Sequence, residues 1–209
     1  MERVGRKSSA MAKLDDIVTH LDGLLKTAEI PDYPGALNGL QLRGAGSVRK
    51  VAAAVDAALP VVREAVDRGA DLLVVHHGMF WAGAQKIDGA YYEKLKLAMD
   101  SGLAVYSCHI PLDVHPRLGN NALLARAIGL VKPQPFFERK GILTGQRFDT
   151  KIRRDTLVRK IERAVGGEVH LAPGGPATAK SIGVITGGAG SEVAAIAACG
   201  IDTFITGEG

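Results

Sequence analysis

Two short motifs place imidazoles and a carboxylate where apolar segments of the chain end. His76-His77-Gly78 follows the apolar run Leu72-Leu73-Val74-Val75, and His109-Ile110-Pro111-Leu112-Asp113 follows Leu103-Ala104-Val105-Tyr106. If both runs are buried strands, the two motifs lie at the sheet edge where α/β proteins bind ligands. A ligand set of imidazole and carboxylate without thiolate suits Zn, Fe, Mn, Co or Ni.

The adjacent pair His76 and His77 is costly to place at the end of an all-apolar strand unless it is hydrogen-bonded or functional. Neighbouring side chains on a regular strand point to opposite faces. Both rings could reach one ion only if the backbone bends, which Gly78 permits; otherwise the two rings could serve two ions. We interpret His76 and His77 as metal ligands.

Asp113 lies in the turn formed by residues 111–116. A carboxylate there could bond its own backbone, or it could bridge two divalent ions as in two-metal hydrolytic sites. With the histidines nearby, we favour the metal role. His109 could be a ligand, could support another ligand or could transfer protons, and we favour the last two roles. Asp56 is expected to cap the helix that follows it, with a supporting role at the site as the alternative.

The glycine-rich stretch 187–191 lies between a predicted strand and a predicted helix. Such a loop could hold a phosphate at a helix N-terminus. It lacks the lysine of a full P-loop, and a tight turn capped by Ser191 explains the pattern equally well.

Hydrophobic periodicity predicts the elements that position these motifs. Helices are expected at 14–25, 60–68, 90–101, 120–128, 156–165 and 191–199, and strands at 48–55, 71–75, 103–107, 181–186 and 203–206. Residues 31–46 are expected to form a loop, and 141–148 a strand or hairpin. The alternation of strand and helix predicts a layered α/β fold. The uninterrupted apolar run 71–75 indicates a parallel sheet covered on both faces.

Segments 48–78 and 180–209 repeat the same order of strand, helix, Gly-x-Asp and strand. The aligned pairs are Gly69 with Gly200, Asp71 with Asp202, and His77 with Glu208. The match is consistent with a structural duplication or with chance. We therefore expect a two-lobed layered α/β fold with pseudo-repeated βαβ units and a metal site in the cleft at the carboxyl ends of the strands.

The first lobe is expected to span residues 11–132 and the second 133–209, with the boundary at Pro133–Pro135. Residues 1–10 are expected to be a disordered extension. The N-terminus has no apolar segment typical of a secretory signal, and no apolar stretch approaches the roughly 20 residues that span a membrane.

The composition is that of a globular protein, with 46% hydrophobic and 23% charged residues. Cys108 and Cys199 are expected to be buried free thiols, which indicates a reducing, cytoplasmic location. The net charge of +4 is mild and aromatic residues are only 5%, which argues against a nucleic-acid groove. A regulator that binds nucleic acid through basic helices around Arg153 and Arg163 is the weakest alternative.

Four motifs resemble those of the NGG-interacting-factor-three-like dinuclear metal proteins, many of which carry the name GTP cyclohydrolase I type 2. They are Asn38-Gly39-Leu40-Gln41, Val75-His76-His77-Gly78-Met79-Phe80-Trp81, the segment from His109 to Pro116, and Ile205-Thr206-Gly207-Glu208. The resemblance extends over essentially the whole chain from Met11. It implies a two-lobed α/β fold, a toroidal homohexamer and two divalent metal ions per subunit.

The resemblance also implies that His76, His77 and Asp113 are metal ligands, with Asp113 bridging the ions. The family's remaining ligands lie in a C-terminal His-x-x-x-Glu segment that nothing in this sequence matches. The chain therefore resembles a C-terminally truncated member with an incomplete second lobe.

Two functions follow as hypotheses. The first is a metal-dependent hydrolase that activates water against a purine nucleotide, with His109 transferring protons. The second is a non-enzymatic metal-binding or scaffold protein.

Overall fold

The computed structural model describes residues 11–208 and shows a mixed α/β fold, as the sequence predicts. The chain divides into two compact units, Met1–Pro111 and Leu112–Gly209. The extension expected at residues 1–10 lies outside the described residues. Among the residues that the structure describes, no helix is long and apolar enough to cross a membrane.

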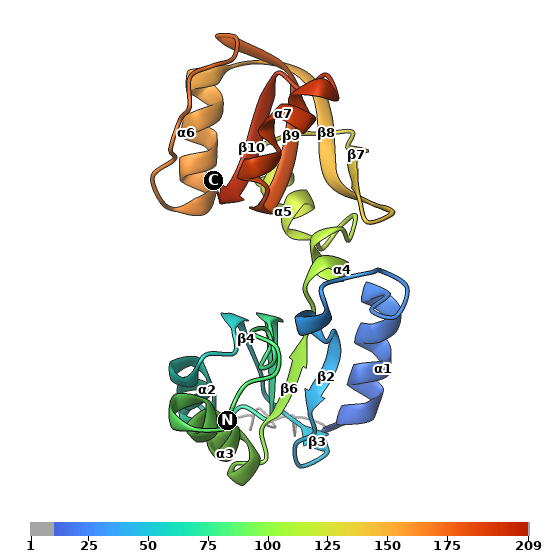
Figure 1. Ribbon diagram of the computed structural model, residues 1–209, viewed down its shortest axis with the longest axis vertical. Helices are drawn as coiled ribbons and strands as arrows, with labels where there is room; N and C mark the ends of the chain where they lie inside the picture. Colours follow the sequence, from blue (N-terminus) through green and yellow to red (C-terminus); the bar gives the residue numbers. More distant parts are fainter. Residues whose placement is uncertain (1–10, 209) are drawn as a thin grey trace, which may run out of the picture. The chain divides into compact units, whose positions relative to one another are not determined.

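A four-stranded sheet forms the centre of the first unit (Figure 1). The elements of this unit are β1 (Ala12–Lys13), α1 (Leu14–Leu25), η1 (Pro34–Ala36), β2 (Gly39–Leu42), β3 (Ser47–Val48), β4 (Val51–Asp56), α2 (Leu59–Asp67), β5 (Leu72–His77), α3 (Gly89–Asp100) and β6 (Ala104–Ser107). The strand order is β2-β6-β5-β4, with β4, β5 and β6 parallel and β2 antiparallel to β6. Helices α2 and α3 lie on one side of the sheet and α1 on the other.

Strand β5 runs through the middle of this sheet and is covered on both faces. Leu73 and Val75 pack with Val62 of α2 and Ala98 of α3 in one buried cluster. Leu72 is also fully buried but points to the opposite face, because side chains alternate along a strand. This two-sided burial explains why the run carries no polar alternation, and it confirms the prediction of a parallel sheet.

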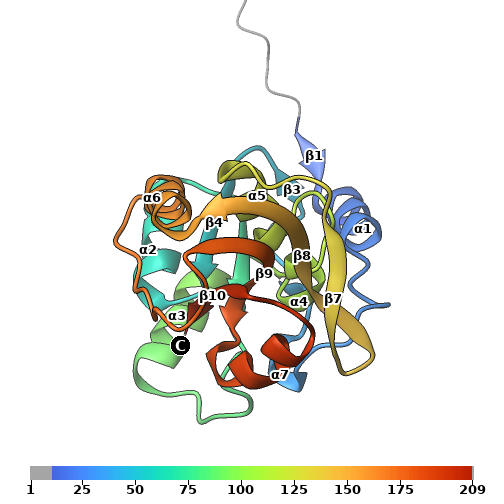
Figure 2. The same cartoon turned by 90° about the horizontal axis from the view of Figure 1, so that it is seen from above.

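The second unit also contains a four-stranded sheet, of order β10-β9-β8-β7. Its elements are α5 (Asn120–Ala127), β7 (Gln134–Arg139), β8 (Ile142–Arg153), α6 (Arg154–Val165), β9 (Thr178–Gly188), η2 (Gly190–Glu192), α7 (Val193–Ala198) and β10 (Thr203–Glu208). Only β9 and β10 are parallel. Figure 2 shows α6 and α7 on opposite sides of β8, β9 and β10.

The two units divide at Pro111, within the short helix α4 (Ile110–Asp113), and not at the expected position near residue 133. The reason lies in α5, which the sequence predicts to be part of the first lobe. Ala125 of α5 and the adjacent Ile128 are buried with Leu157 and Ile161 of α6 against the second sheet. The segment Pro133–Pro135 therefore lies inside the second unit, where it leads from α5 into strand β7.

Four local features differ from the sequence expectations. Cys108 is buried as expected, but Cys199 is exposed, because it follows the short helix α7 at the surface. Residues 39–42 form strand β2, within the segment expected to be a loop, because they pair with β6. Residues 134–139 form β7, which pairs with β8 in a hairpin. Arg153 ends strand β8 and does not lie on a basic helix, although Arg163 does lie in α6.

The same aspartate contact recurs in both βαβ segments. Asp71 Oδ2 accepts hydrogen bonds of 2.8 and 2.9 Å from the backbone N–H groups of residues 49 and 50. Asp202 Oδ2 accepts bonds of 2.9 and 3.2 Å from those of residues 180 and 181. Each aspartate precedes the second strand of its segment and holds the start of the first strand.

Two glycines strengthen this correspondence. Gly69 and Gly200 follow the helices of the two segments with φ of 68° and 77°, a conformation that favours glycine and ends a helix. Strand order, glycine and aspartate therefore agree between the two segments, which supports the structural duplication.

Replacing Asp71 or Asp202 with alanine is expected to lower the free energy of unfolding by about 1 kcal/mol, because two backbone N–H groups lose their acceptor. Hydrogen exchange should quicken at residues 49–50 in the first variant and at 180–181 in the second. Asp67→Ala, at an exposed position of α2, is the control and should change stability by less than about 0.5 kcal/mol. Unchanged exchange at these amides would contradict the prediction.

The contribution of Asp71 should also depend on pH. The hydrogen bonds from the backbone N–H groups of Arg49 and Lys50 lower the pKa of its carboxyl below the ordinary value of 3.8. The stabilisation is therefore complete above the ordinary pKa and is lost as the pH falls through the lowered pKa of the folded state.

Candidate metal centre

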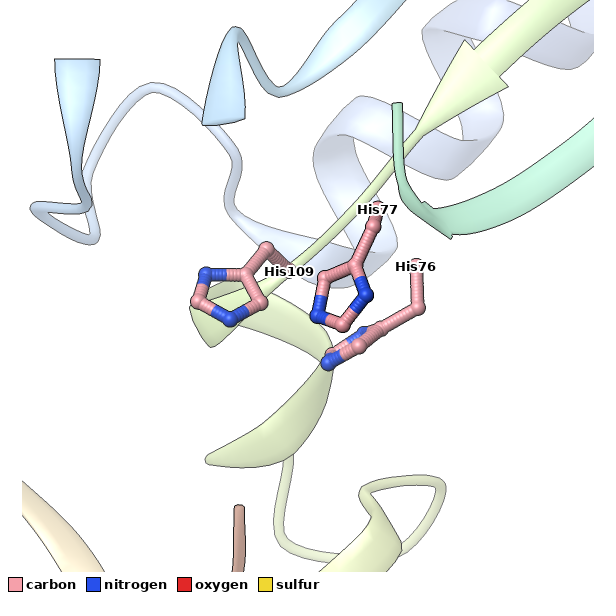
Figure 3. Close-up of side chains that lie close together, drawn as sticks. All are labelled: His76, His77 and His109. Carbon is pink, nitrogen blue, oxygen red and sulfur yellow. The ribbon is translucent and has the colours of Figure 1, made fainter. Parts of the chain in front are cut away.

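Three imidazole rings lie together at the carboxyl edge of the first unit's sheet (Figure 3). His76 and His77 end β5, and His109 follows β6. Val75 of β5 pairs with Ser107 of β6, and the two strands are parallel, so they end at the same edge of the sheet. One ring nitrogen of each histidine lies within 4.8 Å of those of the other two.

The rings of His76 and His77 converge although the residues are neighbours on a strand. Their centroids are 4.8 Å apart. His77 Nδ1 lies 2.7 Å from Asp56 Oδ1 of β4, on one side of β5. His76 Nδ1 lies 3.1 Å from the Cys108 carbonyl oxygen, which follows β6 on the other side. The two strands that flank β5 thus hold one ring each, and the rings meet beyond the strand end.

His109 is held by a buried carboxylate. Its Nδ1 lies 2.8 Å from Asp32 Oδ1, and the side chains of His109 and Asp32 are only 12% and 6% exposed. Asn38 connects the two residues, because its Nδ2 donates to Asp32 Oδ2 and its Oδ1 accepts from the His109 backbone N–H, both at 2.8 Å. The ring is therefore fixed at its side chain and at its backbone.

Asp32 keeps its negative charge in this buried position. Burial alone would raise the pKa of its carboxyl. Hydrogen bonds from the side chains of His109 and Asn38 and from two backbone N–H groups outweigh burial, and the pKa is lowered. An ionised Asp32 can only accept, so His109 Nδ1 must carry the proton.

The same reasoning applies to the other two rings. A backbone carbonyl and a carboxylate can only accept hydrogen bonds, so Nδ1 of His76 and of His77 also donates. Each neutral ring then has its lone pair on Nε2. Such partners behind a histidine are typical of protein metal sites, where they fix the tautomer and the ring orientation.

Three imidazole ligands with an open position match the ligand set of a catalytic zinc site. Ligands at about 2.0–2.1 Å from a tetrahedral ion are roughly 3.4 Å apart, and the three nitrogens here lie within 4.8 Å of one another. An ion could therefore be bound after the ring nitrogens draw together by at most about 1.4 Å. His76, His77 and His109 could hold a metal ion.

Of the residues predicted for the site, the structure brings together His76, His77 and His109. Asp113 belongs to the second unit, where its Oδ1 accepts a 2.7 Å hydrogen bond from Asn120 Nδ2. The proposed roles of Asp113 as a bridging ligand and of His109 in proton transfer stay predictions.

Sequence reasoning missed Asp32, included Asn38 in a motif without giving it a role, and misjudged Asp56. The residue that precedes α2 as its N-cap is Ala58, without a side-chain cap, so Asp56 takes its alternative role beside His77. The register pairs Asp56 with His77, a contact that strand alignment could have suggested. For Asp32, no local pattern indicated a contact with a residue so distant in sequence.

Gln41 joins the loop after η1 to the loop after β5. Its Nε2 donates to the carbonyl oxygens of Ala36 and Leu37, and its Oε1 accepts from the Met79 N–H at 2.7 Å. A Cβ on Gly78 would come within 2.2 Å of this side chain. A side chain at residue 78 would therefore displace the Gln41 amide from these hydrogen bonds. Gly78 is not among the glycines with positive φ.

The glycine-rich stretch 187–191 spans the end of β9 and the start of η2. Ser191 caps neither η2 nor α7, so the expected serine cap is wrong. The following helix α7 has only six residues. A helix this short does not support a phosphate site at its N-terminus.

The fold and the histidine cluster define an α/β protein with a candidate metal centre at strand ends. The chain belongs to the Duf34/NIF3 (NGG1p interacting factor 3) family, whose model matches residues 12–209. This confirms the resemblance seen in the sequence motifs.

The chain is similar to a Deinococcus radiodurans protein named GTP cyclohydrolase 1 type 2 homolog. The two are 37% identical over 196 residues, which cover 93% of this chain and 74% of the relative. Among solved structures, protein ybgI, described as of unknown function, has a TM-score of 0.84 and 33% identity over 93% of this chain and 78% of that one. TTHA1606 from Thermus thermophilus has a TM-score of 0.83 and 32% identity, with coverage of 95% and 78%.

Proposed function

We propose that the protein is a metal-dependent hydrolase of the GTP cyclohydrolase I type 2 kind and that it acts on a purine nucleotide. The observation that carries the proposal is the convergence of three imidazoles, each with its Nδ1 engaged by an acceptor. The name of the Deinococcus radiodurans relative supports the choice of substrate.

The side chains around the cluster have separate tasks in this proposal. Asp56, Asp32 and the Cys108 carbonyl accept the Nδ1 protons, which assigns the binding of the ion to the three Nε2 atoms. A divalent ion bound there would lower the pKa of a bound water toward neutrality. His109 either completes the ligand set or exchanges a proton with the reacting group.

The motif extends the proposal to two ions per subunit, with Asp113 as the bridging carboxylate. A homohexamer is part of the same proposal and is checked by light scattering of the purified protein. A cytoplasmic location is also part of this proposal.

The test is GTP consumption by metal-stripped protein before and after addition of Zn²⁺, Mn²⁺, Fe²⁺, Co²⁺ or Ni²⁺. We expect turnover only with added metal, and none in His77→Ala. His20→Ala changes an exposed histidine of α1 and should retain turnover. Protein that binds metal but leaves GTP intact would overturn the hydrolase proposal and favour a non-enzymatic metal-binding or scaffold protein.

A further inference from the structure

Two exposed aromatic rings border the histidine cluster. Trp81, the single tryptophan of the chain, is 40% exposed and Tyr33 is 44% exposed. The Trp81 ring centroid lies 4.6 Å from that of His77 and 4.5 Å from that of His109. Tyr33 lies 6.0 Å from His109 and 6.4 Å from Trp81. The exposed rings of Trp81 and Tyr33 therefore lie directly beside the candidate metal site.

The Trp81 ring is fixed in orientation by its neighbours. It is tilted by 31° from the His77 ring, and it meets His109 and Tyr33 at 66° and 76°, with edge-to-face geometry. These arrangements are favourable for aromatic pairs. The indole therefore covers the histidines with part of its surface and leaves the rest open.

The backbone beneath both rings is also fixed. A Cβ on Gly35 would lie 2.7 Å from the Trp81 carbonyl oxygen, so the loop that carries Tyr33 packs directly on the loop that carries Trp81. Gln41 ties these loops together through Ala36 and Met79. A ligand that binds here meets rings already in place, which reduces the entropy cost of binding.

We propose that Trp81 is a stacking platform for the heterocyclic base of the ligand and that Tyr33 forms its edge. The ligand class is a planar aromatic heterocycle, such as a purine, because a flat exposed indole offers dispersion and π-stacking and carries no charge. Because the Trp81 ring lies next to those of His77 and His109, a base stacked on it would be held beside the histidine cluster. This inference rests on the proposed function and assigns its substrate-binding residue.

The test measures binding of GMP, AMP and ribose 5-phosphate by isothermal titration calorimetry and by the fluorescence of the single tryptophan. We expect both nucleotides to bind and to quench the indole, and ribose 5-phosphate to do neither. Trp81→Ala should weaken GMP binding by about 5- to 150-fold, the range found for loss of one base–aromatic stack. Trp81→Phe should recover part of the loss.

Tyr92→Ala is the matched control, because Tyr92 is 50% exposed on α3 and should leave GMP binding unchanged. Zinc content is measured in parallel for every variant. Equal GMP binding by Trp81→Ala and the parent protein, or equal binding of GMP and ribose 5-phosphate, would overturn the platform. Loss of zinc in both Trp81→Phe and Trp81→Ala would also overturn it, since Trp81 would then act only by supporting the histidines.

Repeating the titration with metal-stripped protein separates this inference from the proposed function. Trp81-dependent GMP binding without metal-dependent GTP turnover would support the platform and overturn the hydrolase. Metal-dependent turnover in a protein whose GMP affinity is independent of Trp81 would support the hydrolase and overturn the platform.

Discussion

Replacing His77 with alanine is expected to lower the affinity for a divalent metal ion by more than about 100-fold. Loss of a residue that only supports a metal ligand already costs 10- to 100-fold, and His77 would supply a ligand atom itself. The alanine also leaves Asp56 without its ring partner at 2.7 Å. The measurement is metal content per chain by elemental mass spectrometry after dialysis against a fixed Zn²⁺ concentration that saturates the parent protein.

Two further variants make the result specific. His76→Ala should lose metal as His77→Ala does, whereas His20→Ala on α1 should keep it. Full metal content in His77→Ala would contradict a centre built on the histidine pair. A content near two ions per parent chain would support the second ion proposed at Asp113.

His109→Ala separates the two roles left open for that residue. If His109 is a ligand, the variant loses metal together with turnover. If His109 transfers protons, the variant keeps metal and loses only turnover. The geometry favours the ligand role, because the Nδ1 of His109 is engaged by an acceptor in the same way as those of His76 and His77.

The sequence predicts correctly those elements whose apolar residues recur at regular helical or strand spacing. Helix α1 begins and ends at Leu14 and Leu25 as expected, because its apolar residues recur at helical spacing. Strand β2 was missed, because four residues after a proline- and glycine-rich loop show no such pattern. Its strand structure comes from pairing with β6, more than sixty residues later in the chain.

The same distinction holds at the candidate site. His76, His77 and His109 were found because each follows an apolar run that predicts a strand end. Asp32 was missed because its partners His109 and Ile110 lie 77 and 78 residues away. Asp56 was judged by its sequence neighbours, as a helix cap, while its contact is made across the sheet. Local sequence patterns thus predict which histidines lie at the carboxyl edge of the sheet. They do not predict which distant residues orient those histidines.

Replacing Asp32 with asparagine is expected to weaken metal binding by about 10- to 100-fold, although Asp32 would supply no ligand atom. Oδ1 of Asp32 accepts from Tyr33 N–H and His109 Nδ1, and Oδ2 accepts from Asn38 Nδ2 and Ile110 N–H. An asparagine amide turns one of these oxygens into a donor. With the NH2 group at the Oδ1 position, the bonds from His109 Nδ1 and the Tyr33 N–H are lost. With the NH2 group at the Oδ2 position, the His109 ring keeps its acceptor, but the bonds that hold Asn38 and the Ile110 N–H beside it are lost. Either orientation therefore weakens the support of His109.

Asp56→Asn provides the matched comparison. Asp56 is 58% exposed and accepts a bond from one ring only, so the asparagine oxygen can replace the lost acceptor. Metal affinity should then fall by about tenfold or less. Circular dichroism checks that both variants fold, and calorimetric titration with Zn²⁺ gives the two affinities. If a folded Asp32→Asn protein binds Zn²⁺ as tightly as the parent, the ion does not depend on the orientation of His109, and the centre is formed by His76 and His77 without it.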